Sequence, residues 1–162
     1  MAAAAPTPQD FIDVELAAPA VEIERRNNGE LMLRSPVALA THAIHVGEYL
    51  SRWSTDDPAR SFLVERDAGG IWQHLSYGDA ARNADAVSQW LIDNGHGPDR
   101  PVAALCDNCV PMALLKLGAM QIGAPFLPVS PAYSLMSENF AKLKHVVDEL
   151  EPSLIYVPSL AM

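Results

Sequence analysis

The feature that most constrains the fold is an alternation of apolar and amphipathic segments in the last third of the chain. Three short apolar runs, Val102–Cys106, Phe126–Val129 and Leu154–Val157, predict strands. The intervening segments 109–122 and 136–150 predict helices. Strands that recur about every 24–28 residues with helices between them are typical of parallel sheets with right-handed crossovers. We therefore predict an α/β fold with an incomplete parallel βαβαβ sheet layer and helices on both faces.

The first 40 residues predict an N-terminal extension that contains a β-hairpin. Residues 1–20 are rich in Ala and Pro and are interpreted as a flexible lead-in with one short extended stretch, Phe11–Leu16. Residues 21–35 predict the hairpin, with a three-residue loop at Asn27–Gly29. That loop pairs residues whose numbers sum to 56, and it separates an apolar face from a charged face.

The segment between the extension and the alternation predicts two helices and a second hairpin. A helix over 43–54 has Val46, Tyr49, Leu50 and Trp53 on one face and ends at Asp57-Pro58. The second hairpin surrounds residues 67–70, and its register is left open. Its two strands are expected at Phe62–Glu65 and Ile71–Leu75.

A long helix is predicted to follow the second hairpin. Ser76 and Asp79 resemble a capping box at its start, and Asn94-Gly95 mark its end. Its buried face is expected to include Ala84, Val87, Ser88 and Leu91.

Composition excludes several classes of protein. The chain has 11 Lys and Arg against 20 Asp and Glu, a formal charge of -9, which disfavours binding to nucleic acid or to anionic membrane. The most apolar stretch, Val110–Leu127, contains prolines and Lys116 and is not a bilayer span. No basic residue precedes the first apolar residues, so we expect no signal peptide. These features predict a cytoplasmic protein.

The pair Cys106 and Cys109 forms a C-x-x-C motif at a predicted strand end and helix start. A redox dithiol could occupy such a place, because a helix N-terminus stabilises a thiolate. The alternative is a core cysteine followed by a cysteine in the first helical turn, and we favour this structural interpretation. Two cysteines do not make a disulfide scaffold.

No other constellation in the sequence predicts a complete active site. The five histidines share no metal-ligand spacing, so we predict no metal site; they are His42, His45, His74, His96 and His145. The nine glycines form neither a dinucleotide-binding nor a P-loop pattern, and no nucleophile elbow is present.

Two stretches together resemble the adenylate-forming (AMP-binding) superfamily of acyl-CoA synthetases. Leu75–Ala80 (LSYGDA) matches that family's Leu-Ser/Thr-Tyr-x-Glu-Leu motif, with departures at Asp79 and Ala80. Leu117–Tyr133 (LGAMQIGAPFLPVSPAY) matches its motif of a Gly-Ala pair followed by spaced prolines and a tyrosine. The resemblance covers about residues 40–160. Within the family, Val14–Pro36 and Ser130–Ser137 most resemble bacterial feruloyl-CoA synthases.

The resemblance implies an ATP-dependent acid–CoA ligase that adenylates a carboxylic acid, such as the aromatic acid ferulate, and transfers the acyl group to CoA. ATP, Mg²⁺ and CoA are the implied cofactors of the full-length enzyme, and none is expected for this chain alone. Residues 41–162 are interpreted as the truncated N-terminal part of its adenylation domain, whose remainder is the expected partner. The family's phosphate loop and catalytic lysine lie later than both motifs, so we predict the chain alone to be inactive.

The resemblance therefore assigns no catalytic, cofactor-binding or metal-binding residue to this chain. Lys116, Lys142 and Lys144 lie at positions that do not match the family's lysine. Structural roles are expected for Ser76 as a helix cap, Gly123 as a helix end, and Pro128 and Pro131 as brackets of a strand end. A packing role is preferred for Tyr133 over ligand contact.

Two further hypotheses remain beside the ligase fragment. The chain could be a small thiol redox protein that uses Cys106 and Cys109. It could also be a non-catalytic α/β interaction module whose open sheet edge pairs with a partner.

Overall fold

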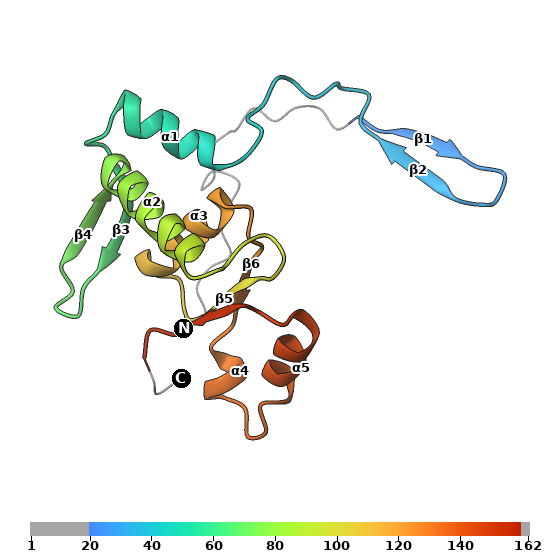
Figure 1. Ribbon diagram of the computed structural model, residues 1–162. Helices are drawn as coiled ribbons and strands as arrows, with labels where there is room; N and C mark the ends of the chain where they lie inside the picture. Colours follow the sequence, from blue (N-terminus) through green and yellow to red (C-terminus); the bar gives the residue numbers. More distant parts are fainter. Residues whose placement is uncertain (1–19, 160–162) are drawn as a thin grey trace, which may run out of the picture. The chain divides into compact units, whose positions relative to one another are not determined.

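The computed structural model describes residues 20–159, which form two compact units, one ending at His42 and the other beginning at Ala43 (Figure 1). The strands are β1 (Glu22–Arg25), β2 (Leu31–Arg34), β3 (Ser61–Arg66), β4 (Trp72–Ser76), β5 (Val102–Leu105), β6 (Phe126–Val129) and β7 (Leu154–Tyr156). The helices are α1 (Gly47–Asp56), α2 (Tyr77–Asp93), α3 (Val110–Gln121), α4 (Ala132–Leu135) and α5 (Ala141–Leu150). The extended stretch expected at Phe11–Leu16 lies outside the described residues.

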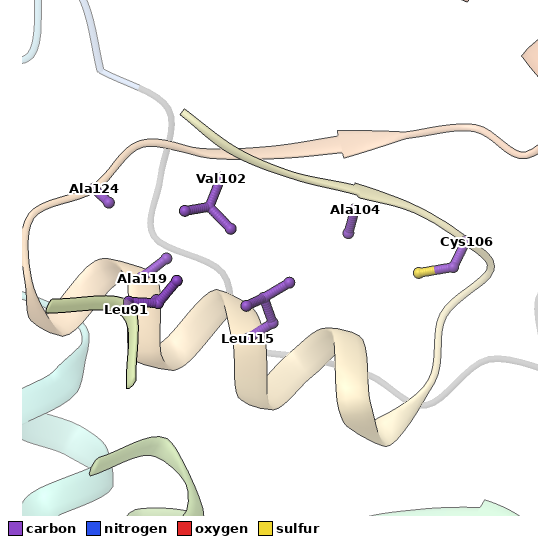
Figure 2. Packing of buried hydrophobic residues seen from close by; sticks show 7 residues of the cluster. All are labelled: Leu91, Val102, Ala104, Cys106, Leu115, Ala119 and Ala124. Atoms are coloured by element: carbon purple, nitrogen blue, oxygen red, sulfur yellow. The ribbon is translucent and has the colours of Figure 1, made fainter. Parts of the chain in front are cut away.

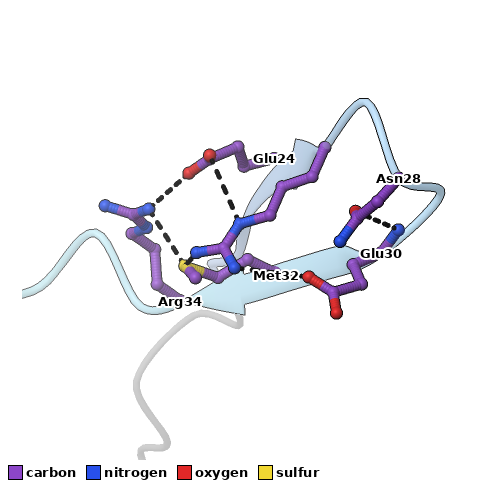
Figure 3. A network of polar contacts seen from close by, with 6 residues as sticks. Glu24, Asn28, Glu30, Met32 and Arg34 are labelled. Carbon is purple, nitrogen blue, oxygen red and sulfur yellow. Dashed lines mark hydrogen bonds and ion pairs between the residues drawn. The ribbon is translucent and has the colours of Figure 1, made fainter.

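The first unit is the hairpin of β1 and β2, and its predicted register is confirmed. Glu22 pairs with Arg34 in an antiparallel ladder, so the paired residue numbers sum to 56. Gly29 has a φ of 87°, the left-handed conformation that a three-residue loop requires. Figure 3 shows the charged face, on which the Glu24 carboxylate lies 2.6 Å from Arg34 and 3.9 Å from Arg26.

The opposite face of this hairpin is apolar and exposed. Its four aliphatic side chains are each between 53% and 64% exposed; they are Val21, Ile23, Leu31 and Leu33. A two-stranded hairpin is marginally stable in water, because one pair of strands buries little apolar surface. Within the first unit, the described residues leave this face uncovered.

The second unit contains the predicted parallel sheet, in the strand order β6-β5-β7. Val102 of the central strand is in register with Phe126 of β6 and with Leu154 of β7. All four residues of β5 are buried, as expected of a strand that is paired on both edges and covered on both faces. Figure 1 shows α2 and α3 on one side of the sheet and α4 and α5 on the other.

Helix α3 belongs to two hydrophobic clusters, which explains why its sequence is apolar almost all round. Leu115 and Ala119 pack toward the sheet with Leu91 and Val102 (Figure 2). Leu114 and Leu117, on another side of α3, pack against the cluster of Leu50, Ala80 and Ala84 from α1 and α2. Helix α3 is therefore covered on two of its sides.

The contact between α2 and α3 depends on a glycine. A Cβ built on Gly118 would lie 2.6 Å from Cγ1 of Val87 and 3.2 Å from the carbonyl oxygen of Ala84. Beside it, the buried Ser88 hydroxyl lies within hydrogen-bond distance of the carbonyl oxygens of Ala84 (2.9 Å) and Gly118 (3.0 Å), which share its single hydrogen. These contacts hold the two helices closer than a larger residue at position 118 would permit.

Local signals placed the second hairpin and the long helix correctly. β3 and β4 are antiparallel, with Leu63 opposite Leu75, which supplies the register that the sequence left open. The Ser76 hydroxyl caps α2, accepting from the Asp79 backbone N–H at 3.1 Å and donating to the Asp79 carboxylate at 2.6 Å. Gly95 follows the helix with a φ of 77°, as the predicted stop requires.

Two predicted helices have wrong boundaries. The helix expected over 43–54 spans Gly47–Asp56. Of the residues expected on its apolar face, Leu50 is buried, whereas Val46 and Tyr49 are exposed. The helix expected over 136–150 begins only at Ala141, and the short α4 precedes it.

The delay at Ala141 has a local cause. The Ser137 hydroxyl accepts from the backbone N–H of Phe140, and the Asn139 amide oxygen accepts from that of Ala141. Phe140 is left-handed, with a φ of 56°. Ser and Asn side chains compete with the helix for backbone hydrogen bonds, so the helix begins later than the apolar periodicity predicts.

Candidate functional site

The candidate site is a cluster of thiol, phenol and carboxyl side chains at the carboxyl ends of β5 and β7, beside the β3–β4 hairpin. The turn Cys106–Cys109 follows β5, and Tyr156 is the last residue of β7. Glu65 of β3 reaches this place across 45 residues of sequence, where its Oε2 accepts from the backbone N–H of Val110 at 3.0 Å. The carboxylate thus caps the N-terminus of α3, where unpaired N–H groups carry partial positive charge.

Two cavities open on this cluster. One cavity, of about 490 Å³, is bounded by the β3–β4 hairpin, by the start of α3 and by the end of β7. Tyr156 and Pro158 are among the residues that line it. The other cavity, of about 350 Å³, lies between β3 and α3, and its lining includes Asn108 and Lys116. Glu65, Cys109 and Val110 line both cavities.

The surroundings of the Cys106 thiol oppose thiolate formation. Burial raises the pKa of the Cys106 thiol, and its contacts with Cys109 and the nearby Asp107 carboxylate raise that pKa further. A reactive dithiol needs the opposite shift, because the thiolate is the nucleophile. The structure therefore disfavours the redox-enzyme hypothesis and agrees with the structural interpretation of the C-x-x-C motif.

Tyr156 is the other ionisable group of this cluster. Burial raises the pKa of its phenol, and the neighbouring Cys109 and Cys106 thiols and the Glu65 carboxylate raise it further. The phenol therefore stays protonated at neutral pH and keeps its hydrogen-bond donor. Sequence analysis missed both Tyr156 and Glu65, since neither lies in a recognisable motif.

The histidines do not come together. Their described polar neighbours differ: Ala40 for His42, Glu48 for His45, Ser61 for His74, Ser153 for His96 and Glu149 for His145. Within residues 20–159, no three His, Cys, Asp or Glu side chains are grouped so that they could hold a metal ion.

The matched motif residues have mainly structural surroundings. Gly123 follows α3 with a φ of 74°, the left-handed conformation expected of a helix end. Pro128 lies in β6, and Pro131 immediately precedes α4. The Tyr133 ring is half-buried, and the Lys142 ammonium lies 5.6 Å from its centroid. Lys116 is exposed on α3, and Lys144 is exposed on α5.

Residues 50–161 match the family model described as AMP-binding enzyme. The chain belongs to this family. The expected superfamily is thereby confirmed, and the match covers both motif stretches and the whole parallel sheet.

Curated relatives of this AMP-binding chain are large peptide synthases. It is 29% identical over 109 residues to a component of the linear gramicidin synthase of Brevibacillus parabrevis, covering 67% of this chain and 2% of that protein. It is 33% identical over 61 residues to a dimodular nonribosomal peptide synthase of Bacillus subtilis, covering 38% of this chain and 3% of that protein. These relatives do not support the narrower resemblance to feruloyl-CoA synthase.

Solved structures share the fold. A fatty acid AMP ligase from Legionella pneumophila superimposes with a TM-score of 0.61 at 17% identity, covering 68% of this chain and 19% of that one. VinN, solved with L-aspartate, gives a TM-score of 0.61 at 20% identity, covering 72% and 28%. The α/β architecture predicted from the sequence is confirmed. Within the described residues, no helix combines the length and the apolar character that crossing a bilayer requires.

Proposed function

We propose that this chain forms the N-terminal part of a larger adenylate-forming ligase. That enzyme would join a carboxylate to the α-phosphate of ATP, with Mg²⁺, to give an acyl-adenylate and pyrophosphate. The observation that carries the proposal is the family match over residues 50–161, on a chain that spans only 19% of a matching AMP ligase. The missing remainder of the adenylation domain is the expected partner.

The proposed role of this part is to support the enzyme rather than to react. The N-terminus of α3 is a place where a phosphate could bind, but the Glu65 carboxylate already occupies its Val110 N–H. A phosphate beside that carboxylate would also meet like charge. The triphosphate is therefore assigned to the remainder of the domain, and the absence of catalytic residues in this chain stays a prediction.

The acid and the acceptor are open to two candidates. The motifs at Val14–Pro36 and Ser130–Ser137 favour an aromatic acid such as ferulate and transfer to the CoA thiol. The curated relatives favour an amino acid that is activated for peptide synthesis. A cytoplasmic location is kept as part of the proposal.

Pyrophosphate exchange into ATP tests the proposal. The longer gene product should exchange labelled pyrophosphate in the presence of one class of acid, either aromatic acids or amino acids, and the active class decides between the two candidates. Formation of a CoA thioester with ferulate would identify the acceptor for the first candidate. The 162-residue chain should show no exchange with any of these acids.

Two results would contradict the proposal. Exchange by the 162-residue chain alone would show that its own residues suffice for adenylation. No exchange by the longer product with any carboxylic acid, while its folded state is verified by thermal unfolding, would contradict the adenylating activity itself.

A further inference from the structure

The strand order points to one place on the sheet as a ligand site. The chain passes from β5 to β6 at one edge and returns past β5 to β7 at the other edge. The connection after β5 lies on one face of the sheet, and the connection after β6 lies on the other (Figure 1). In doubly wound sheets of this order, ligands bind outside the carboxyl ends of the first and third strands, where the connections diverge. Here these strands are β5 and β7.

The larger of the two cavities described above lies at this point. Its volume of about 490 Å³ falls within the range typical of small-molecule sites. Apolar atoms of Leu75, Pro111, Tyr156 and Pro158 line it. The β3–β4 hairpin closes one side, so the cavity is bounded by three separate segments of the chain.

The carboxylates that line the cavity outnumber its guanidinium groups, which favours a positively charged ligand. Glu65 and Asp67 contribute two carboxylates against the single guanidinium of Arg66. That guanidinium lies over the Trp72 ring, 4.4 Å from its centroid. His74 also lines the cavity, with its Nδ1 at 3.0 Å from the Ser61 hydroxyl.

The carboxylates of Asp67 and Glu65 differ in how many further hydrogen bonds they can accept. Asp67 accepts from the backbone N–H groups of Gly69 and Ile71 with Oδ1, and from the Gln73 amide with Oδ2. Glu65 uses only Oε2, so Oε1 has no hydrogen-bond partner among residues 20–159. Glu65 is also only partly exposed, which strengthens a charge-assisted hydrogen bond to it.

We propose that this cavity binds a small aromatic or aliphatic molecule that carries a protonated amine. The apolar body packs against Leu75, Pro111 and Tyr156, and the ammonium group donates to Oε1 of Glu65. The phenol of Tyr156 is an uncharged neighbour that can accept a second hydrogen bond from the ammonium. The ring of the same residue offers a face to the cation. The site is separate from the proposed adenylation chemistry and does not depend on it.

Three probes that differ only in their polar group test this site on the 162-residue chain. Phenethylamine is the expected ligand, and 3-phenylpropionate and 2-phenylethanol are its anionic and neutral counterparts. Phenethylamine should give saturable amide chemical-shift changes at Glu65, Val110 and Tyr156. It should also slow the alkylation of Cys109, which lines the cavity. The two counterparts should bind at least about tenfold more weakly, as expected for one lost charge-assisted hydrogen bond.

Glu65→Gln is the matched variant, because its amide oxygen can still accept from Val110 while the negative charge is removed. It should weaken phenethylamine binding about tenfold and leave amide signals remote from the cavity unchanged. Glu149→Gln, on the exposed side of α5, removes the same charge at a distance and should leave binding unchanged.

Equal binding of the three probes would overturn the proposal, as would shift changes confined to another surface. Unchanged affinity in Glu65→Gln would overturn it too. None of these measurements involves ATP, so a failure here leaves the proposed adenylating function untouched, and a failure of pyrophosphate exchange leaves this site untouched.

Discussion

The Glu65 carboxylate and the Val110 backbone N–H, 45 residues apart in the chain, are joined by a hydrogen bond of 3.0 Å. The bond ties the β3–β4 hairpin to the first turn of α3. Cys109, the residue at the N-cap of that helix, makes no side-chain capping hydrogen bond. Glu65 therefore supplies the cap that the local sequence lacks, and it also places a negative charge near the positive end of the helix.

Removing this remote cap should destabilise the second unit. Glu65→Ala is expected to lower the free energy of unfolding by about 1–2 kcal/mol, the usual cost of losing an N-cap. Glu65→Gln keeps an acceptor oxygen and should retain most of that stability. Urea unfolding of both variants checks the prediction, and equal losses would show that hydrogen-bonding capacity is irrelevant there.

The close packing of α2 on α3 makes Gly118 sensitive to a single methyl group. Gly118→Ala places a Cβ 2.6 Å from Cγ1 of Val87, so we expect it to lower the free energy of unfolding by about 1–3 kcal/mol. This reverses the usual advantage of Ala over Gly in a helix. Gly97→Ala is the control, because a Cβ there has no neighbour within 4 Å. Calorimetric unfolding that ranks the two variants equally would contradict the prediction.

Asp67 should titrate at unusually low pH. The hydrogen bond from the backbone N–H of Ile71 is the main cause of its lowered pKa, and the hydrogen bond from the Gln73 amide adds to it. Both bonds stabilise the charged carboxylate, so the pKa lies below the ordinary value of 3.8. The turn contacts of Asp67 therefore stabilise the folded chain fully above pH 3.8 and lose that effect as the pH falls through the lower folded-state pKa.

Carboxyl NMR of the folded chain should give Asp67 a titration midpoint below 3.8. Asp67→Asn should make the stability of the chain less dependent on pH in that acidic range. A midpoint at or above 3.8 would mean that the turn does not favour the charged form.

The Cys106 thiol should be slow to alkylate. Because burial raises its pKa above the ordinary 9.0, little thiolate is present near neutral pH. In Cys109→Ser, iodoacetamide should modify Cys106 more slowly in the folded chain than in urea. The pH at half-maximal rate should exceed 9.0 in the folded chain. A midpoint below that value would revive the redox interpretation of the motif.

Local patterns predicted the elements whose signals lie within a few residues. The bounds of β6 matched its apolar run, and Ser76 capped α2 through its own neighbour Asp79. The β1–β2 register followed from loop length and from Gly29. The start of α5 was wrong because Ser137 and Asn139 redirect nearby backbone hydrogen bonds, a competition that apolar periodicity does not record.

The amino-acid order alone is enough for the fold class, the parallel sheet and the family, because these rest on periodicity, turn residues and contiguous motifs. The order β6-β5-β7, the capping of Val110 by Glu65 and the cavity at Tyr156 required the folded chain. These features join residues tens of positions apart. Their contacts arise from the packing of whole elements, so neither of the two segments in contact carries a local sequence pattern that would predict them.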